Sequence, residues 1–280
     1  MSQKNKVTTS TDKRKMHQDF WKEIKSQART VVKAEPFLNK FFIHQVHEHD
    51  SLCQALAHQL SLKLDHHSLD SCEVEILLLD AFQRSDNLLW AACEDMKAYV
   101  DRDPACKYYL EPLLFFKGFQ ALQVYRASHV YWRRGKKMTA KLLQSLAAQS
   151  FSVDIHPAAR IGTGILIDHA TNLVIGETAK VGDNVSILHG VTLGGTGKES
   201  GDRHPKIGHG VLLSAHAQLL GNIKVGNNAK IGAGAVVLVD VPNHTTYAGV
   251  PAKMVGKPSG DIPALCMESN FVWDSDLESV

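Results

Sequence analysis

The sequence of 280 residues has few cysteines, and they are not spaced for a disulfide framework or a zinc motif. They number five, an odd count, and no two are separated as Cys-x-x-Cys. Disulfide-stabilised folds and zinc knuckles need paired or closely spaced cysteines, so both are disfavoured. We interpret the cysteines as free thiols on helices: Cys53, Cys72, Cys93, Cys106 and Cys266.

Long apolar runs and an excess of charge are also missing. No apolar run approaches the roughly 20 residues of a membrane-spanning helix, and the N-terminus lacks the apolar core of a signal peptide. Lys and Arg together number 31 against 29 for Asp and Glu, a formal net charge of +2. This balance gives no electrostatic reason to expect nucleic acid or a membrane as partner. We therefore expect a cytoplasmic protein that binds neither.

What the sequence does contain is a repeat of six residues between Ile155 and Val237. An Ile, Leu or Val recurs at every sixth position, often followed by Gly. A period of six fits neither an α-helix, at about 3.6, nor a simple strand, at about 2. It fits a coil with three flat faces, each built from one hexapeptide whose aliphatic residue points inward. The pattern predicts a left-handed parallel β-helix over residues 151–257.

The preceding part of the chain has apolar residues at helical spacing, such as the leucines that recur at every fourth position from Leu52 to Leu64. We expect a helical domain over residues 16–150. The predicted fold class is therefore α+β, an all-helical N-terminal domain followed by a left-handed parallel β-helix of hexapeptide repeats. The polar ends, residues 1–15 and 258–280, are predicted to be flexible tails.

A basic run, Arg133-Arg134-Gly135-Lys136-Lys137, lies within the helical part. It suits either a phosphate or nucleic-acid contact or a charged turn between two helices. No Gly-rich phosphate loop accompanies it in the helical half, so we favour the charged turn.

The six-residue pattern is interrupted twice, and polar residues gather at both places. Two extra residues follow His169, and eight more belong to an inserted loop over residues 194–206. Insertions in a solenoid form loops on one face, often the binding face. The loop carries Arg203, whose guanidinium suits a carboxylate, and a second imidazole, His204. The interruptions are therefore where we expect the functional site.

His169 is a candidate general base. Asp154 lies fifteen residues earlier, just short of the roughly eighteen residues of one turn, so the two side chains are expected to meet at one corner. A carboxylate that holds one imidazole nitrogen leaves the other free to deprotonate an alcohol. A surface histidine without a catalytic role is the alternative on composition alone.

The same histidines admit a metal site. His169 and His189 occupy equivalent positions on consecutive turns, about 4.8 Å apart. His204, His209 or His216 would complete a three-histidine zinc site like that of the trimeric β-helical carbonic anhydrases. This region offers only one short pair of the His-x₃₋₅-His kind, His204 and His209, and we rank a zinc hydratase lower.

Four segments resemble serine acetyltransferase, the enzyme that makes O-acetylserine for cysteine synthesis. They are residues 153–159 (VDIHPAA), 167–171 (IDHAT), 191–198 (VTLGGTGK) and 201–206 (GDRHPK). The resemblance covers about residues 16–258. The loop and the Asp-His-Ala element together are specific to the family, whereas the hexapeptide pattern alone indicates only the acyltransferase superfamily.

The resemblance implies that a serine hydroxyl attacks acetyl-CoA directly, without an acyl-enzyme and without a metal. His169 would be the base, oriented by Asp154, with His204 assisting the tetrahedral intermediate. By the same resemblance, four residues bind serine: Asp103, Asp168, Arg203 and His204. Four residues contact coenzyme A: Gly195, Ala215, Lys230 and Gly234.

The resemblance also implies partners. It predicts a homotrimer through the β-helices or a dimer of trimers, L-cysteine as an inhibitor in the serine pocket, and docking of the C-terminal tail on O-acetylserine sulfhydrylase. Three departures stand out: His189 where some members have Gln, His216 where many have Gly, and Val280 where the tail usually ends in Ile.

Two alternatives to serine acetyl transfer remain besides the zinc hydratase. An O-acetyltransferase for another hydroxyl, such as that of a sugar, is disfavoured because a neutral sugar offers no charges to pair with Asp103, Asp168 and Arg203. The other alternative is a non-catalytic scaffold that only binds the sulfhydrylase, in which the candidate base His169 would have no role.

Overall fold

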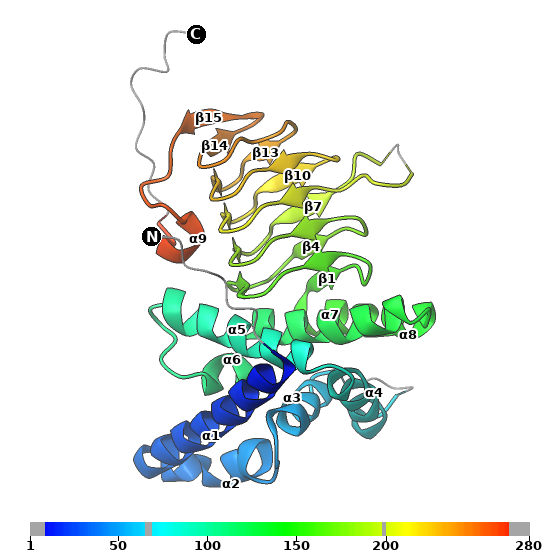
Figure 1. The fold of residues 1–280 in the computed structure, drawn as a ribbon, viewed down its shortest axis with the longest axis vertical. Coiled ribbons are helices and arrows are strands. Elements are labelled where there is room, and N and C mark those ends of the chain that lie inside the picture. The colour runs from blue at the N-terminus through cyan, green and yellow to red at the C-terminus, as the bar shows by residue number, and fades with distance from the viewer. Residues whose placement is uncertain (1–8, 65–68, 198–199, 269–280) are drawn as a thin grey trace.

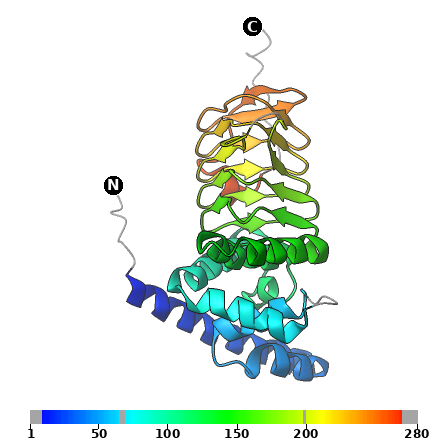
Figure 2. The same cartoon turned by 90° about the vertical axis from the view of Figure 1, so that its right-hand side faces the viewer.

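The structure is a computed structural model that describes residues 9–64, 69–197 and 200–268. A layer of helices from the N-terminal half stands at one end of a long parallel β-coil (Figure 1). The view turned by 90° shows the same stacking of coils above the helices (Figure 2). This arrangement confirms the predicted order of a helical region followed by a β-solenoid.

Four of the described helices, α1, α3, α4 and α5, begin at a short polar side chain that caps them. Thr9 and Asp70 form capping boxes with Asp12 and Glu73, and the Ser51 hydroxyl accepts from the Gln54 N–H. The helices are α1 (Ser10–Ala34), η1 (Pro36–Leu38), α2 (Asn39–Phe42), η2 (Ile43–His47), α3 (Leu52–Ser61), α4 (Ser71–Gln83), α5 (Asp86–Arg102), α6 (Leu110–Leu114), α7 (Lys117–Arg133), α8 (Lys137–Phe151) and α9 (Pro263–Cys266).

Two predicted boundaries differ from the structure. α1 begins at Ser10, inside the segment expected to be a tail, because the capping box at Thr9 starts the helix earlier than its apolar stripe does. α9 lies inside the expected C-terminal tail. Residues 1–8 and 269–280 of the two predicted tails lie outside the described residues.

The coil has three faces, which we call I, II and III in the order that the chain visits them. Face I contains β1 (Val153–Ile155), β4 (Leu173–Ile175), β7 (Thr192–Gly194), β10 (Gln218–Leu220) and β13 (Val236–Val237). Face II contains β2 (Arg160–Ile161), β5 (Lys180–Val181), β8 (Lys206–Ile207) and β11 (Lys224–Val225). Face III contains β3 (Leu166–Ile167), β6 (Ser186–Ile187), β9 (Leu212–Leu213), β12 (Lys230–Ile231), β14 (Thr246–Gly249) and β15 (Ala252–Gly256).

The aliphatic residue of each hexapeptide stacks on its equivalent in the next turn. Ile167 pairs with Ile187, which pairs with Leu213, and all three are at most 1% exposed. The strands are parallel except β15, which folds back antiparallel on β14. This hairpin caps the last coil, where an open edge would otherwise be exposed.

A buried ion pair fastens the helices to the first coil. Asp95 of α5 is 0% exposed and accepts hydrogen bonds from Arg126 of α7 (3.0 and 2.8 Å to Oδ2), from Gln123 and from the Ile165 N–H of the coil. Burial raises the pKa of Asp95, while the Arg126 charge and these donors oppose the rise. Removing one partner of such a buried pair costs about 3–5 kcal/mol.

Two tyrosine hydroxyls extend this attachment. Tyr99 donates to the Ile167 carbonyl (2.8 Å) and accepts from the Ile167 N–H (3.2 Å), while Tyr125 donates to the Ala159 carbonyl (2.6 Å). Ile167 lies two residues before His169. The helical half therefore holds the backbone that leads into the predicted site.

Candidate functional site

His169 lies on the corner between faces III and I, where the chain leaves β3. Its φ is +54° and that of Ala170 is +60°, the left-handed region that such residues rarely adopt. Strain of this kind persists at functional sites. The imidazole is 76% exposed, and its Nε2 lies 3.7 Å from Oδ1 of Asp168. The first interruption of the repeat thus turns His169 out toward solvent.

Asp103 follows directly after α5, the helix that contacts the strand before His169. Asp95 of α5 bonds to Ile165, and Tyr99, one helical turn on, bonds to Ile167. The helix ends at Arg102, and Oδ1 of Asp103 accepts a hydrogen bond from the Ala105 N–H (2.9 Å). Of the two predicted amine-binding carboxylates, Asp168 therefore lies beside the predicted base, and the part played by Asp103 stays a prediction.

A column of imidazoles continues up this corner. The His169 and His189 rings meet edge to face with centroids 5.9 Å apart, and His189 meets His216 in the same way at 4.9 Å. Among the residues that the structure describes, Nδ1 of His189 has no hydrogen-bond partner, and it is buried. Within the described ranges no group of three or more metal-ligand side chains is placed to hold a metal. Of the three residues that the zinc interpretation offers as a third ligand, His216 continues this column, whereas His204 and His209 lie on other corners.

Arg203 and His204 lie on the corner between faces I and II. Nη2 of Arg203 is 2.9 Å from Oε2 of Glu177, and this guanidinium holds the pKa of Glu177 below its usual value. The His204 ring packs on Gly176, where a Cβ would lie 2.0 Å from two ring atoms. Its Nδ1 accepts from the Thr178 N–H (3.2 Å).

The electrostatics keep His204 neutral. The residue is 7% exposed, and burial lowers its pKa, helped by the nearby charges of Arg203 and Lys206. A neutral ring with Nδ1 as acceptor can carry its proton on Nε2 and donate from there. This is the form needed to stabilise a developing oxyanion.

Within a single chain the residues at the His169 corner are separate from those at the Arg203 corner. Strand β4, three residues or about 10 Å long, separates the His169 corner from the Arg203 corner. In the described part of the chain no hydrogen bond or ion pair joins the two groups. A single chain therefore has His169 with Asp168 beside it at one corner and the Arg203 guanidinium at another.

Among the described contacts none joins Asp154 to His169. Asp154 pairs in register with Val174, so this turn has 20 residues and not the roughly eighteen assumed from the sequence. Oδ1 of Asp154 accepts from Nε2 of Gln144 at 2.6 Å. The orienting role of Asp154 therefore stays a prediction.

The residues predicted to contact coenzyme A lie in three places. Ala215 and Gly234 adjoin on the corner between faces III and I, joined by a hydrogen bond from the Gly234 N–H to the Ala215 carbonyl (2.9 Å). Gly195 lies beside Arg203 on the other corner. Lys230 is on face III and only 3% exposed, and burial lowers its pKa.

Sequence reasoning missed Glu177 and Thr178. They follow Ile175 at an ordinary corner, and their partners lie 25 or 26 residues later, across the inserted loop. The one available signal was the Glu-Thr pair at a corner of the coil where neighbouring turns place small residues.

Comparisons with known proteins agree with this layout. A family model described as "Serine acetyltransferase, N-terminal" matches residues 20–124, and one described as "Bacterial transferase hexapeptide (six repeats)" matches residues 204–238. Serine acetyltransferase from Salmonella typhimurium is 49% identical over 251 residues, which are 90% of this chain and 92% of that protein. The chain belongs to the serine acetyltransferase family.

Solved structures of serine acetyltransferases share this fold. The enzyme from Vibrio cholerae is 50% identical with a TM-score of 0.89, over 91% of this chain and 99% of that one. A serine acetyltransferase in complex with cysteine is 44% identical (TM-score 0.88; 91% and 99% covered), and one from Brucella abortus in complex with coenzyme A is 44% identical (0.83; 86% and 96%). The enzyme from Neisseria gonorrhoeae in complex with serine is 48% identical (0.80; 84% and 96%).

Proposed function

We propose that this protein transfers the acetyl group of acetyl-CoA to the hydroxyl of L-serine, giving O-acetyl-L-serine and coenzyme A. The observation that carries the proposal is the exposed His169 on its left-handed corner, with Asp168 beside it. Membership of the serine acetyltransferase family and the relatives solved with serine and with coenzyme A support the choice of both substrates.

In the proposed reaction His169 removes the proton from the serine hydroxyl as its oxygen attacks the thioester carbonyl. A tetrahedral intermediate forms, its oxyanion receives a hydrogen bond from His204, and the carbon–sulfur bond then breaks. The proton on His169 passes to the departing sulfur, which restores the neutral base. A positioned general base of this kind contributes roughly 10²–10⁴ in rate.

A cysteine nucleophile has no part in this scheme. Burial raises the pKa of Cys53 to about 11 and that of Cys106 to about 12, so both thiols stay protonated near neutral pH. The thiolate is the nucleophilic form. Direct attack by the serine hydroxyl is the route that these residues favour.

Serine would be held by charges at its two ends. Asp103 and Asp168 would pair with the ammonium, and Arg203 would pair with the carboxylate. Arg203 is already oriented by Glu177 (2.9 Å) and by the Gly201 carbonyl (3.1 Å), which leaves its remaining donors for a ligand. L-Cysteine has the same ammonium and carboxylate, so we propose that it inhibits by occupying this pocket, in line with the relative solved with cysteine.

A complete site needs a second copy of the chain. Face I carries exposed apolar side chains, including Val174 (39% exposed) and Leu238 (52%) next to β13. If face I turns inward in a threefold assembly, the His169 corner of one copy approaches the Arg203 corner of the next. We propose a homotrimer of this kind. A dimer of trimers through the helical halves would cover exposed apolar residues there, such as Phe37 (96%).

Three expectations stay predictions. Asp154 is proposed to orient His169 once the assembly forms. Docking of the C-terminal tail on O-acetylserine sulfhydrylase involves Val280, which lies outside the described residues. A cytoplasmic location is proposed; in the described ranges, no helix is long and apolar enough to cross a membrane.

The test is thiol release from acetyl-CoA in the presence of L-serine, of a neutral sugar, or of neither, with and without a chelator. We expect release that requires serine and ignores the chelator, and we expect His169→Ala to abolish it without changing the oligomer. Release with the sugar but not with serine would refute the proposal, and so would loss of activity on chelation.

A further inference from the structure

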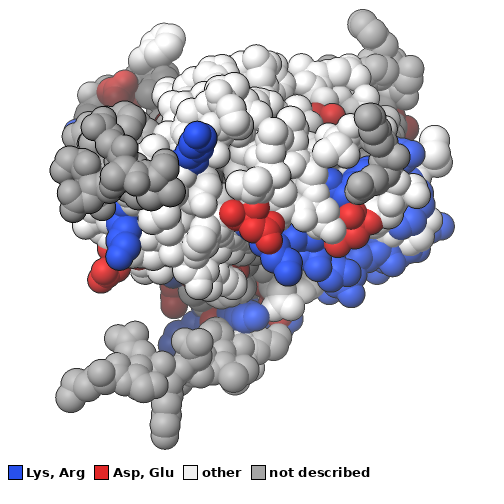
Figure 3. Space-filling model, turned by 90° about the horizontal axis from the view of Figure 1, so that it is seen from above, with Lys and Arg blue, Asp and Glu red and all other residues white. Residues whose placement is uncertain are grey.

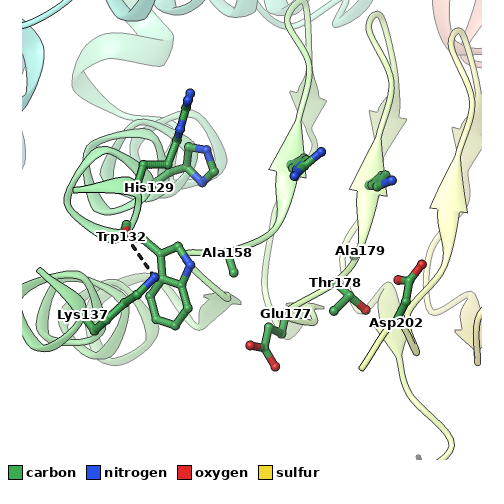
Figure 4. Close-up of a pocket in the computed structure, with 11 residues that line it drawn as sticks. His129, Trp132, Lys137, Ala158, Glu177, Thr178, Ala179 and Asp202 are labelled. Carbon is green, nitrogen blue, oxygen red and sulfur yellow. Dashed lines mark hydrogen bonds between the residues drawn. The ribbon is translucent and has the colours of Figure 1, made fainter. Parts of the chain in front are cut away.

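A cavity of about 850 Å³ opens between the turn that joins α7 to α8 and the first coils. Figure 4 shows Trp132 and Lys137 on the helical side of it, with Glu177, Thr178 and Asp202 on the side of the coil. Its size is that of a small-molecule site, typically about 300–1,000 Å³. The proposed acetyl transfer uses the neighbouring Arg203 corner and leaves this cavity without a role.

Positive charge predominates around the cavity. Arg133 and Lys137 line it from the helices, and Arg160 and Lys180 line it from face II. Lys137 donates to the Trp132 carbonyl (3.0 Å) and lies 3.6 Å from the centre of that indole ring. Taking the described residues alone, none of these four cations forms an ion pair with a carboxylate.

The two acidic residues of the lining are already engaged. Glu177 pairs with Arg203, and Asp202 pairs with Lys206 at 2.6 Å. The histidine of the lining, His129, is held neutral because burial and nearby arginines lower its pKa. An anion that entered the cavity would therefore meet four cations that form no ion pair with a described carboxylate.

The same charge repeats along face II. Arg160, Lys180, Lys206 and Lys224 pair in register on four consecutive turns. Adjacent strands lie about 4.8 Å apart, and like charges directly opposite one another destabilise a sheet. Seen along the coil, Lys and Arg side chains gather on one side of the molecule (Figure 3). In this column Lys206 is already paired with Asp202, whereas an anion in the cavity would neutralise Arg160 and Lys180.

We propose that the cavity binds a small soluble molecule that carries two or more linked phosphates, such as pyrophosphate or the diphosphate of a nucleotide. Arg133 and Arg160 provide planar forks for bidentate contact with phosphate oxygens, and Lys137 and Lys180 add point charges. None of the residues predicted to contact coenzyme A is among the described residues that line the cavity, although Gly195 lies beside Arg203 on the neighbouring corner. Binding in the cavity does not depend on the proposed acetyl transfer.

The test is calorimetric titration of the intact oligomer with pyrophosphate at low ionic strength, in a buffer without phosphate. We expect saturable binding that weakens as salt is added. The double variant Arg160→Gln/Lys180→Gln should bind at least about tenfold more weakly, since charge-assisted hydrogen bonds to phosphate are the stronger kind. The matched control is Lys224→Gln, which removes a charge from the same column outside the cavity and should change the affinity less than about twofold, as expected for a screened surface charge.

Three results would overturn the proposal. They are no binding at millimolar pyrophosphate, an equal loss of affinity in Lys224→Gln, and competitive displacement of pyrophosphate by coenzyme A. Serine-dependent thiol release should be retained in both variants when pyrophosphate is absent. Retained thiol release shows that the variants are folded. Weaker pyrophosphate binding is then caused by the loss of the cavity side chains and not by unfolding.

Discussion

The hydroxyl of Tyr99 links the helical half to the corner that carries His169. Removing this hydroxyl should slow the proposed acetyl transfer. Tyr99 is 2% exposed, and its hydroxyl makes two hydrogen bonds to the backbone of Ile167, two residues before His169. Tyr99→Phe deletes both bonds and leaves the buried Ile167 N–H and carbonyl each short of one partner. A buried polar group left unsatisfied costs about 1–3 kcal/mol.

The matched control is Tyr125→Phe. Tyr125 is also buried (5% exposed) and also donates to a coil carbonyl, that of Ala159 at 2.6 Å, but on the corner between faces I and II. We expect both variants to lose stability by amounts of the same order, about 1–3 kcal/mol. Only Tyr99→Phe should also lower kcat, because it loosens the backbone that sets the position of His169.

The assay combines urea unfolding with initial rates of serine-dependent thiol release. A fall in kcat of about tenfold corresponds to about 1.4 kcal/mol of lost transition-state stabilisation, and we expect Tyr99→Phe to lie near this value. Two outcomes would refute the reasoning. One is a normal kcat in Tyr99→Phe, and the other is an equal fall in Tyr125→Phe, which would indicate a general effect of docking the helices.

Two further predictions concern the position of the His204 ring and the three histidines whose pKa is lowered by burial. Gly176→Ala places a Cβ 2.0 Å from the His204 ring, so the KM for serine should rise and kcat should fall; unchanged kinetics would mean that the ring has no set position. Burial lowers the pKa of His129, His156 and His204 below the usual 6.5, so the unfolded chain binds more protons as the pH falls below that value, and stability is lost. Urea unfolding at pH 7.5, 6.5 and 5.5 should show falling stability, and a rise toward pH 5.5 would contradict the assignment.

The coil itself was predictable because its signal is local. Each hexapeptide commits its own aliphatic residue to the interior, so counting along the chain locates the faces without knowledge of any neighbour. The two interruptions of the repeat can be located by the same counting. They coincide with the corner that carries His169 and the corner that carries Arg203. The start of α1 was misplaced because the capping box of Thr9 and Asp12 lies outside the apolar stripe.

The pairing of side chains across the coil was less predictable. Asp154 and His169 were expected to meet from an assumed turn of eighteen residues, whereas the register gives 20 there. The contacts of Glu177 with Arg203 and of Thr178 with His204 depend on how an inserted loop folds back. From the residues alone, the sequence supported a general base near carboxylates and an arginine able to bind a carboxylate. The roles of the individual residues came from the family resemblance.

The central claim is that the site forms between two copies of the chain, with His169 from one and Arg203 from the next. Co-expression of His169→Ala and Arg203→Ala chains under two affinity tags allows mixed oligomers to be purified through both tags. Each variant alone should be inactive. In a cyclic trimer that contains both chains, one of the three junctions brings both intact residues together, so about a third of wild-type serine-dependent thiol release is expected. Mixed oligomers with no activity above the parents would contradict the claim.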